Sequence, residues 1–418
     1  MNFSNVIAHA SVKFEFFRTR FRQQGVKWVV GRLIKQLMMG VGWLVLLPVT
    51  LVLHLIGYRR VTVFTDRIGH LAAEIDCFLK EKALGRLPDH YWFVLAPPHR
   101  ISNRALLEYW RPHIRILTSP WLCGLLSSMT WWRGLMTLDV SHYVLRLNST
   151  AVYYEVCAEW GNRFPLLRLS QADHEKGRNV LEAMGMPRDA WFICVQAREG
   201  GFSPVDEILH QHRNSDILRL VPAMEFIASR GGWCVRMGDP TTIPLPPLPK
   251  TIDYAHHPAK SEWLDVFLCA SCRFFFGNSS GLSIVSSIFG VPCALANMIP
   301  LSNLGYSPQD VSIPKLLRRK GESRHLSFGE IFRSPLADYR LAKLYQDAGI
   351  EVEENSAEDI LALAREMCDR VEGRMVYDDT DTALQRRFHA LLRPGHYGYG
   401  AASRVGAAFL RKYERLLP

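Results

Sequence analysis

From residue 61 onward, short apolar runs alternate with longer stretches in which apolar residues recur every three or four positions. Short runs are typical of buried strands, and the longer period is typical of amphipathic helices. The runs predicted to form strands are Val61–Phe64, Tyr91–Leu95, Ile114–Leu117, Trp191–Ala197, Trp233–Met237, Phe274–Phe276 and Val291–Ala296. The main predicted helices cover residues 71–82, 103–110, 174–184, 216–229 and 282–289. This alternation predicts an α/β fold with parallel sheets.

The stretch from Asp265 to Pro300 shows this pattern most clearly, as helix, strand, loop, helix and strand. Its loop consists of small residues, namely Gly277, Asn278, Ser279, Ser280 and Gly281. A loop between the carboxyl end of a parallel strand and the start of a helix presents backbone N–H groups and hydroxyls to an anion. A tight turn without a ligand is the alternative interpretation.

Residues 1–60 differ from the rest of the chain. Basic residues alternate with apolar ones up to Lys35, which is typical of an amphipathic helix on anionic lipid. The run Leu37–Gly57 approaches the ~20 apolar residues that span a bilayer. Because Pro48 lies near its middle and Arg59 and Arg60 follow it, we interpret the segment as a re-entrant or shallow anchor. A simple span and a buried core helix are the alternatives.

The pattern predicts four parts along the chain. Residues 1–60 form a membrane-associating helical segment, and residues 61–185 form an N-terminal Rossmann-like domain. Residues 186–385 form a C-terminal Rossmann-like domain, and residues 386–418 form a C-terminal helix. A loop is predicted between Phe202 and Arg213, and an irregular region is predicted after Pro300.

Composition narrows the choice of partners. The 418 residues are 48% hydrophobic and carry a formal net charge of +10, which suits a phosphorylated substrate or an anionic membrane surface. Because the basic residues cluster beside the apolar N-terminal segment, lipid is favoured over nucleic acid. Nine cysteines lie mostly within apolar runs. The CxxC spacing of Cys269 and Cys272 has no second pair to complete a zinc site, so core thiols in a reducing compartment are expected.

Arg198 is the strongest single candidate for binding a phosphorylated ligand. It follows the predicted strand of residues 191–197 directly and stands beside Gly200 and Gly201. A guanidinium group matches a diphosphate bidentately, and the glycines would let a ligand approach the backbone. The alternative is a salt bridge to Glu199 or Asp216.

Further candidates follow later strands. The residues predicted to bind the donor phosphate are Arg198, Ser279, Ser280 and Gly281. The residues predicted to bind the nucleotide are Arg236, Gly238, Asp239, His256, Lys260 and Asn278. Asp239 could accept hydrogen bonds from a ribose or base, with a turn cap as the equal alternative. A loop histidine or a solvated charge is the alternative for the others. The sequence has no HExxH motif and no P-loop lysine motif, so neither a zincin nor a P-loop kinase is indicated.

Several motifs together carry a family resemblance. The segments VQAREGGF, HRNSDI, WCVRMGDP and YAHHPAKSEWLDVFLCASCRFFFGNSSGLSIVSSIFGVP occur in this order. With TDRIGHLA before them and SRVGAAFLRKY after them, they resemble a bacterial family of glycosyltransferases from surface-polysaccharide clusters. The chain is similar, more distantly, to O-fucosyltransferase-like GT-B enzymes. The resemblance covers about residues 61–415.

The resemblance implies a GT-B-like fold in which two Rossmann-like domains face a cleft. It implies a nucleotide-sugar donor, a glycan or lipid-linked acceptor, and no metal or other cofactor. An arginine after the corresponding strand binds the donor phosphate in the relatives, and this maps onto Arg198. The acidic residue that follows in their motif is not cleanly matched here, because Glu199-Gly200-Gly201 stands in its place.

An inverting transfer needs a base to deprotonate the acceptor hydroxyl. In a GT-B enzyme the base usually comes from the N-terminal half, so Asp66 and His70 are the first candidates, and Glu199 is a third. Each could equally be a loop cap or a structural residue. Candidates for the acceptor side or its loop are Arg67, Gly69 and Asn103.

The expected activity is sugar transfer at the cytoplasmic face of the bacterial inner membrane. Two alternatives belong to other classes. One is a non-catalytic component that binds a glycan or nucleotide sugar in a polysaccharide assembly complex. The other is a sugar-nucleotide epimerase with two Rossmann-like domains, which would need neither a membrane nor an acceptor.

Overall fold

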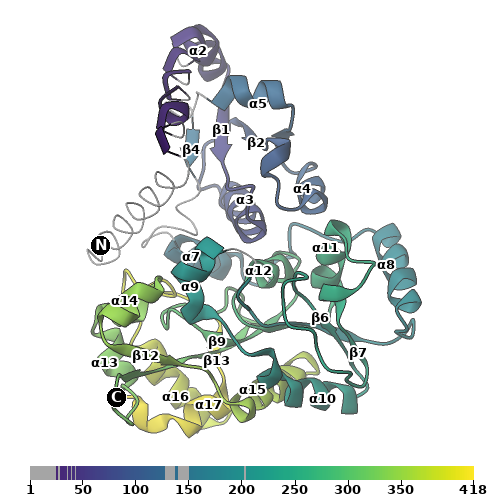
Figure 1. The fold of residues 1–418 in the computed structure, drawn as a ribbon, viewed down its shortest axis with the longest axis vertical. Helices are drawn as coiled ribbons and strands as arrows, with labels where there is room; N and C mark the ends of the chain where they lie inside the picture. The colour runs from purple at the N-terminus through teal and green to yellow at the C-terminus, as the bar shows by residue number, and fades with distance from the viewer. Residues whose placement is uncertain are drawn as a thin grey trace. The chain divides into compact units, whose positions relative to one another are not determined.

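A computed structural model of the chain describes residues 25–26, 29–34, 36–38, 40–42, 44–127, 137–139, 150–201 and 204–418. Most of the basic amphipathic helix predicted before residue 36 lies outside these residues. The chain divides into two compact units, Asn2–Arg146 and Leu147–Pro418, each with its own parallel sheet (Figure 1).

The N-terminal unit contains a four-stranded parallel sheet. Its strands are β1 (Tyr58–Thr62), β2 (Tyr91–Leu95), β3 (Arg115–Leu117) and β4 (Thr137–Asp139), in the order β3-β2-β1-β4. The helices described around them are α2 (Leu47–Leu55), α3 (Ile68–Ala83), η1 (Pro98–Arg100), α4 (Arg104–Trp110) and α5 (Pro120–Leu126). The chain winds outward in both directions from β1, so the loop after β1 lies at a topological switch point, where α/β sheets bind ligands.

Strand β1 begins earlier than the apolar pattern predicted. The prediction started at Val61, but Tyr58 already pairs with Tyr91 of β2. The turn between α2 and β1 is tight, and it places Gly57 in the left-handed region with φ of 87°. Strand pairing therefore includes Arg59 and Arg60, which the sequence pattern assigned to the flank of the apolar segment.

The C-terminal unit contains a seven-stranded sheet in which all neighbours are parallel. Its strands are β5 (Phe192–Gln196), β6 (Trp233–Arg236), β7 (Thr251–Ile252), β8 (Phe275–Gly277), β9 (Cys293–Met298), β10 (Val311–Pro314) and β13 (Arg404–Val405). The order is β13-β10-β9-β8-β5-β6-β7. Strands β5 to β10 thus follow the Rossmann order, with the switch point between β5 and β8.

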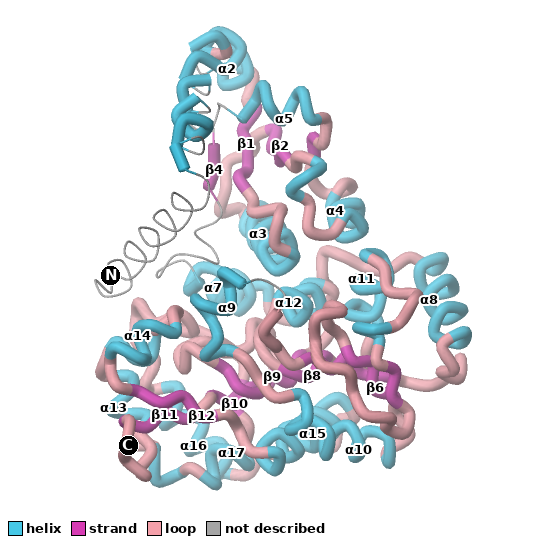
Figure 2. The backbone as a smooth tube through the Cα atoms, viewed as in Figure 1, coloured by secondary structure: helices cyan, strands magenta, loops and turns pink. Residues whose placement is uncertain are grey.

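Helices cover both faces of this sheet (Figure 2). One face carries α10 (Val221–Ser229) and α15 (Ala357–Val371), which pack against each other. The other carries α11 (Glu262–Ser271), which contacts both α8 (Gln171–Ala183) and α12 (Gly281–Ile288). Phe274 and Phe276 belong to the core on the α10 and α15 side, as the alternation of a strand requires.

The remaining elements complete the C-terminal unit. They are α7 (Thr150–Trp160), α9 (Pro204–His210), η3 (Gln211–Arg213), η4 (Ile217–Leu220), η5 (Tyr254–His256), β11 (Leu316–Arg319), α13 (Phe328–Phe332), η6 (Pro335–Asp338), α14 (Ala342–Asp347), β12 (Ile350–Glu353), α16 (Asp379–His389), α17 (Ala407–Lys412) and η7 (Glu414–Leu416). Strands β11 and β12 form an antiparallel pair.

The second unit begins before residue 185, the predicted domain boundary, because α7 and α8 pack within it. The Tyr154 hydroxyl in α7 donates to the carbonyl of Leu304 at 2.5 Å. The indole N–H of Trp263 in α11 donates to Asp173 in α8 at 3.1 Å. These contacts fix both helices to the C-terminal sheet.

Two stretches that the sequence pattern predicted as irregular contain regular structure. The predicted loop between Phe202 and Arg213 contains α9 and η3, and the region directly after Pro300 contains β10 and β11. These elements are too short to show a period, so their form depends on the surfaces they pack against. All nine cysteines are buried, as the apolar runs predicted.

Candidate functional site

The switch point of the C-terminal sheet joins the loops after β5 and β8. Gly277 ends β8 with φ of 149°, and a Cβ atom there would lie 1.9 Å from the carbonyl oxygen of Gln196. Asn278 follows and is buried; its Oδ1 accepts from the backbone N–H of Arg198 at 2.8 Å. Its Nδ2 donates to the carbonyl of Arg213 at 3.1 Å. Asn278, predicted to bind nucleotide, therefore ties three loops together.

The guanidinium group of Arg198 is half-buried and faces the segment after α9. Its Nη1 donates to the carbonyl of His210 at 3.2 Å and to the side-chain oxygen of Asn214. The Asn214 Nδ2 in turn donates to Glu207 at 2.8 Å. Arg198 thus lies at the carboxyl end of β5, as predicted, and it also holds the 210–214 segment in place.

Other cations gather around the same segment. Arg213 donates to the carbonyl of Ser279 at 3.0 Å, so it joins η3 to the small-residue loop. Lys315, which directly follows β10, is 2% exposed, and its Nζ donates to the carbonyl of Asn214 at 2.6 Å. Burial lowers the pKa of Lys315 to about 8, while nearby Glu354 acts in the opposite direction.

His212 lies among these cations. Burial, followed by the charges of Arg213, His210, Lys315 and Arg198, lowers the pKa of His212 to about 2. Neither of its ring nitrogens has a hydrogen-bond partner within the described parts of the chain. The imidazole is therefore neutral, and an anion bound beside it would offset the surrounding charge.

The small-residue loop leads into α12. Ser280 caps the helix: its hydroxyl accepts from the Ser283 N–H at 3.2 Å, and its own N–H donates to the Ser283 hydroxyl at 3.1 Å. Gly281 is the first residue of α12. Of the residues predicted to bind the phosphate, Ser280 is therefore the N-cap of α12. Ser279 is half-exposed and precedes the helix N-terminus, where the partial positive charge of the helix favours an anion.

The loop Gly277–Gly281 also fits the G-x-S-x-G pattern of serine hydrolases, in which the serine occupies a strained turn. Outside the masked positions, the non-glycine residues with positive φ are Lys250 and Asn297. Ser279 therefore does not adopt that turn, and a hydrolase elbow is not formed.

Arg236, at the end of β6, is fully buried in a network of carboxylates. It pairs with Glu199 at 3.0 Å and with Asp253 at 3.1 Å. Glu199 also accepts from the Ile243 N–H at 2.6 Å. Asp253 accepts from His256 at 2.9 Å. Arg236, His256 and Glu199, predicted as nucleotide or catalytic residues, here fix the loop after β6 to the sheet.

The other predicted nucleotide residues lie around the same loop. Gly238 has φ of 156°, and a Cβ atom there would lie 3.3 Å from Thr242. Asp239 accepts from the Thr241 N–H at 2.9 Å, which is the turn cap that stood as its alternative. Lys260 pairs with Asp265 at 2.8 Å.

In the N-terminal unit, the start of α3, which follows the loop after β1, presents a histidine–carboxylate pair. His70 Nδ1 lies 2.9 Å from Oε1 of Glu74, which is fully buried at the next turn of α3. The other carboxylate oxygen of Glu74 accepts from the Phe64 N–H at 2.9 Å. Each carboxylate oxygen of Glu74 thus has one hydrogen-bond partner, and the fixed carboxylate orients the His70 ring. The sequence offered a signal for this pair, because the two residues are four apart on one helix face.

The remaining candidates of this unit have other contacts. Asp66 forms an exposed ion pair with Arg100 at 2.9 Å. Arg67 is the residue before α3, and Gly69 is the second residue of that helix. Asn103 caps α4 by accepting from the Leu106 N–H at 2.8 Å.

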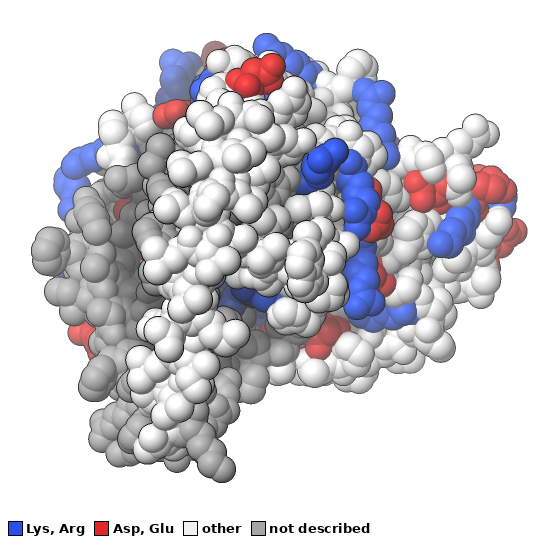
Figure 3. Space-filling model, turned by 90° about the horizontal axis from the view of Figure 1, so that it is seen from above, with Lys and Arg blue, Asp and Glu red and all other residues white. Residues whose placement is uncertain are grey.

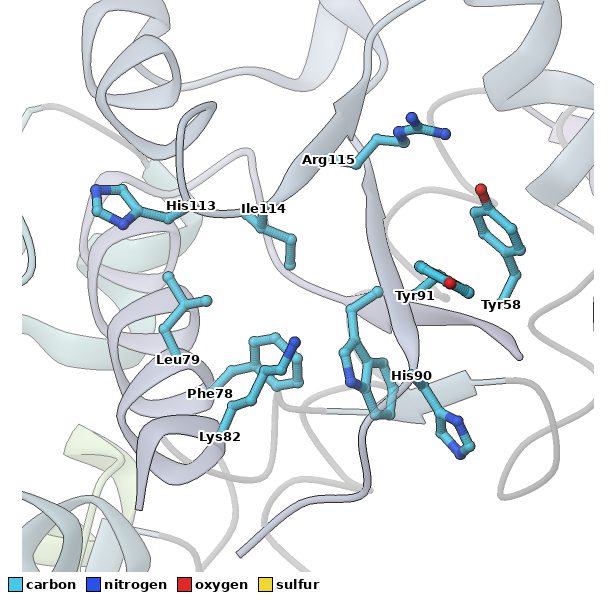
Figure 4. Close-up of a pocket in the computed structure, with 10 residues that line it drawn as sticks. Tyr58, Phe78, Leu79, Lys82, His90, Tyr91, His113, Ile114 and Arg115 are labelled. Carbon is cyan, nitrogen blue, oxygen red and sulfur yellow. The ribbon is translucent and has the colours of Figure 1, made fainter. Parts of the chain in front are cut away.

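Two cavities within the described parts of the chain lie at amino-terminal strand ends. The first, of about 310 Å³, is lined by residues at the starts of β1, β2 and β3 and by the end of α3, with Lys82 directed between them (Figure 4). The second, of about 610 Å³, includes Arg273, Pro292 and Gln309. Ligands of α/β sheets bind at the opposite, carboxyl edge. We therefore place the candidate site at the switch points and not in these cavities.

Among the described residues, no cluster of three or more His, Cys, Asp or Glu side chains has metal-binding geometry. Asp379-Thr380-Asp381 has the DxD spacing of metal–nucleotide sites. Its second aspartate pairs instead with Arg411 at 2.7 Å and belongs to the capping box that starts α16.

No protein-family model matches the sequence, and no curated protein matches it. Similar solved structures are glycosyltransferases. A glycosyltransferase family 9 protein from Veillonella parvula is 14% identical over 57% of this chain and 79% of that chain, with a TM-score of 0.36. The E. coli ADP-heptose LPS heptosyltransferase II is 13% identical over 64% of this chain and 92% of that chain, with a TM-score of 0.38.

A third similar structure is the iron-containing dodecameric glycosyltransferase TibC from enterotoxigenic E. coli. It is 12% identical over 64% of each chain, with a TM-score of 0.33. Likenesses at this level assign no activity, donor or metal to the present chain.

Proposed function

We propose that this protein is a glycosyltransferase that moves a sugar from a nucleotide-sugar donor to an acceptor hydroxyl. The observation that carries the proposal is the switch point between β5 and β8, where Arg198 and the loop Gly277–Gly281 meet. In doubly wound sheets, a nucleotide's phosphates bind at this position. The family resemblance of the motifs that form the two loops supports the same conclusion.

In this proposal the donor diphosphate lies between the start of α12 and the cations around the 210–214 segment. Ser279 and the helix N-terminus supply hydrogen-bond donors, and Arg198, Arg213 and Lys315 supply positive charge. These groups stabilise the charge that develops on the diphosphate as the bond to the sugar breaks.

We assign the base to His70 rather than to Asp66 or Glu199. The carboxylate of Glu74 accepts the Nδ1 proton of His70, which leaves Nε2 to take a proton from the acceptor hydroxyl. The acceptor oxygen then attacks the sugar carbon as the diphosphate departs, which inverts the configuration at that carbon. Asp66 and Glu199 are held in ion pairs with Arg100 and Arg236.

The decisive experiment measures product formation by the full chain. UDP-, GDP-, ADP-, CDP- and TDP-sugars are incubated with the protein and a bacterial membrane extract, and release of the nucleoside diphosphate is followed with and without extract. Release that depends on the extract supports the proposal. Donor isomerisation without extract identifies an epimerase, and binding without turnover identifies a non-catalytic component.

The variant Arg198→Ala is expected to lose donor turnover. Because Arg198 also holds the 210–214 segment, its melting curve is compared with that of wild type. Arg324→Ala is the matched control, since Arg324 forms an exposed ion pair with Glu330 elsewhere in the same unit. Full turnover by a folded Arg198→Ala variant would remove the central assignment.

A further inference from the structure

The N-terminal unit exposes an unusual amount of apolar surface. Of the 23 large hydrophobic side chains that are exposed among the described residues, 14 lie between Val26 and Ile56. No single described helix is long and apolar enough to cross a membrane, but Val29–Gly42 and Leu47–Leu55, bent by 55°, pass that test as a pair. Single exposed hydrophobics are ordinary, whereas a contiguous set of this size marks an interaction surface.

Helix α5 adds a second segment to this surface. Trp121 is 70% exposed and Leu125 is 37% exposed, and they lie one turn apart on the same face of α5. Helices α5 and α2 are neighbours, because Leu126 and Leu53 pack on the same cluster of Phe93, Leu95 and Cys123 (Figure 1). The exposed side of α5 therefore continues the apolar surface at a point some 70 residues away in sequence.

In the sequence, the N-terminal segment carries charge of one sign. Residues 16–65 contain no Asp or Glu, while their basic residues are Arg18, Arg20, Arg22, Lys27, Arg32, Lys35, Arg59 and Arg60. Seen from above, uncharged side chains dominate the central surface, and Lys and Arg side chains lie beside it together with some Asp and Glu side chains (Figure 3). A second copy of the chain would bring the same positive charges against these. An anionic lipid surface would attract them.

We propose that the helices Val29–Gly42 and Leu47–Leu55 and the Trp121–Leu125 face of α5 enter an anionic lipid bilayer together. The unit is then seated on the membrane by two separate segments and not by an N-terminal tether alone. Tryptophan suits this position, because its indole prefers the boundary between acyl chains and headgroups. The proposal does not depend on the catalytic function.

The test places a fluorescent reporter on α5. All nine native cysteines are buried, so a Leu125→Cys variant of the full chain can be labelled selectively with an environment-sensitive dye such as NBD. The labelled protein is mixed with phosphatidylcholine vesicles that contain or lack phosphatidylglycerol. We expect flotation with the anionic vesicles, a blue shift of the dye, and quenching by nitroxide groups on the acyl chains. A Val376→Cys label, at an 83% exposed position of the C-terminal unit, should show neither change.

A second variant tests the contribution of α5 to affinity. Trp121→Ser with Leu125→Ser removes apolar area from the proposed contact, and we expect vesicle binding to weaken about tenfold. The variant's melting curve is compared with that of wild type, because Leu125 is 37% exposed and its replacement also removes packing within the unit.

Three results would overturn the proposal. A label at position 125 that stays in water while the protein floats would remove α5 from the contact. Equal binding to neutral and anionic vesicles would remove the role of charge. Absence of vesicle binding together with a dimer in light scattering would show that a second copy covers the surface.

Discussion

Glu74 is the residue that distinguishes His70 from the other proposed bases. The sequence presented His70 as one of three candidate bases, and it did not distinguish among them. In the folded unit, a fully buried carboxylate lies 2.9 Å from His70 Nδ1, and the same carboxylate is held by the Phe64 N–H. Such a pair fixes the ring and the tautomer, which is what a general base requires.

Replacing His70 by Gln should lower kcat by about 10² to 10⁴, because the acceptor hydroxyl would lose its proton acceptor. KM for the donor should change little, since His70 lies in the other unit from the proposed phosphate site. The measurement is acceptor-dependent release of the nucleoside diphosphate. Asp66→Asn is the matched control, and it should retain activity within a few fold. Loss of activity in the control with activity kept in His70→Gln would reverse the assignment.

Lys315 predicts a pH dependence of stability. Its pKa is about 8 in the folded chain and about 10.4 when unfolded. Between these values the unfolded chain binds more protons, so the free energy of unfolding rises with pH, by up to about 3 kcal/mol from this group. Urea unfolding from pH 7.5 to 10.5, compared with Lys315→Met, isolates the contribution. Parallel curves for the two proteins would show that Lys315 is not desolvated.

Position after a strand predicted where polar side chains lie but not what they contact. Arg198 and Asn278 were selected as ligand-binding candidates by their position after a strand. Both lie at the switch point, because the carboxyl ends of parallel strands share one edge, and their binding of a ligand stays a prediction. The same rule selected Arg236 and Glu199, which the fold pairs with each other. Residues distant in sequence, such as Ile243 and Asp253, decide whether a charged side chain contacts a ligand or another part of the protein. Position along the sequence does not reveal these neighbours.

At the scale of elements, the approach of β5 to β8 depends on a missing side chain. Gly277 combines φ of 149° with a carbonyl only 1.9 Å from where a Cβ atom would lie. The small-residue loop is therefore required by strand packing as well as by any ligand. Ser280 adds a capping box that starts α12 directly after it.

Gly277→Ala should destabilise the C-terminal unit by at least about 3 kcal/mol, since it combines a strained backbone with a clash against Gln196. Chemical unfolding followed by circular dichroism gives the value. Gly124→Ala in α5 is the control, because it has open space around it and should stabilise the helix by up to about 1 kcal/mol. A Gly277→Ala variant as stable as wild type would mean that β5 and β8 lie further apart.

Some short elements escaped the sequence pattern. Helix α3 has enough turns for a period to appear, and the apolar run Phe274–Phe276 indicated β8, whereas α9 and β10 gave neither signal. Yet the short elements contribute to the candidate site: η3 brings Arg213 to Ser279, and the residue after β10 brings Lys315 to Asn214. Sequence reasoning therefore missed the cation cluster while finding the strand ends beside it.

At the scale of the whole molecule, the proposed diphosphate site predicts ligand-linked stability. A nucleoside diphosphate at about 100 times its Kd should raise the free energy of unfolding by about 2.7 kcal/mol, because it binds only the folded chain. Thermal unfolding with each nucleotide gives the shift, and Arg198→Ala should shift less. Absence of a shift with every nucleotide would contradict a nucleotide site at the β5–β8 switch point.

By itself the sequence determined that this chain folds as α/β units, because the periods of its apolar residues fix which segments become strands and helices. It also determined the apolar, cationic character of the first sixty residues. Only the tertiary structure decided the order of the strands, and with it the two switch points, because strand order follows from the packing of distant segments. It also decided which charged side chains neutralise one another. Local pattern carries no information about partners that lie a hundred residues away.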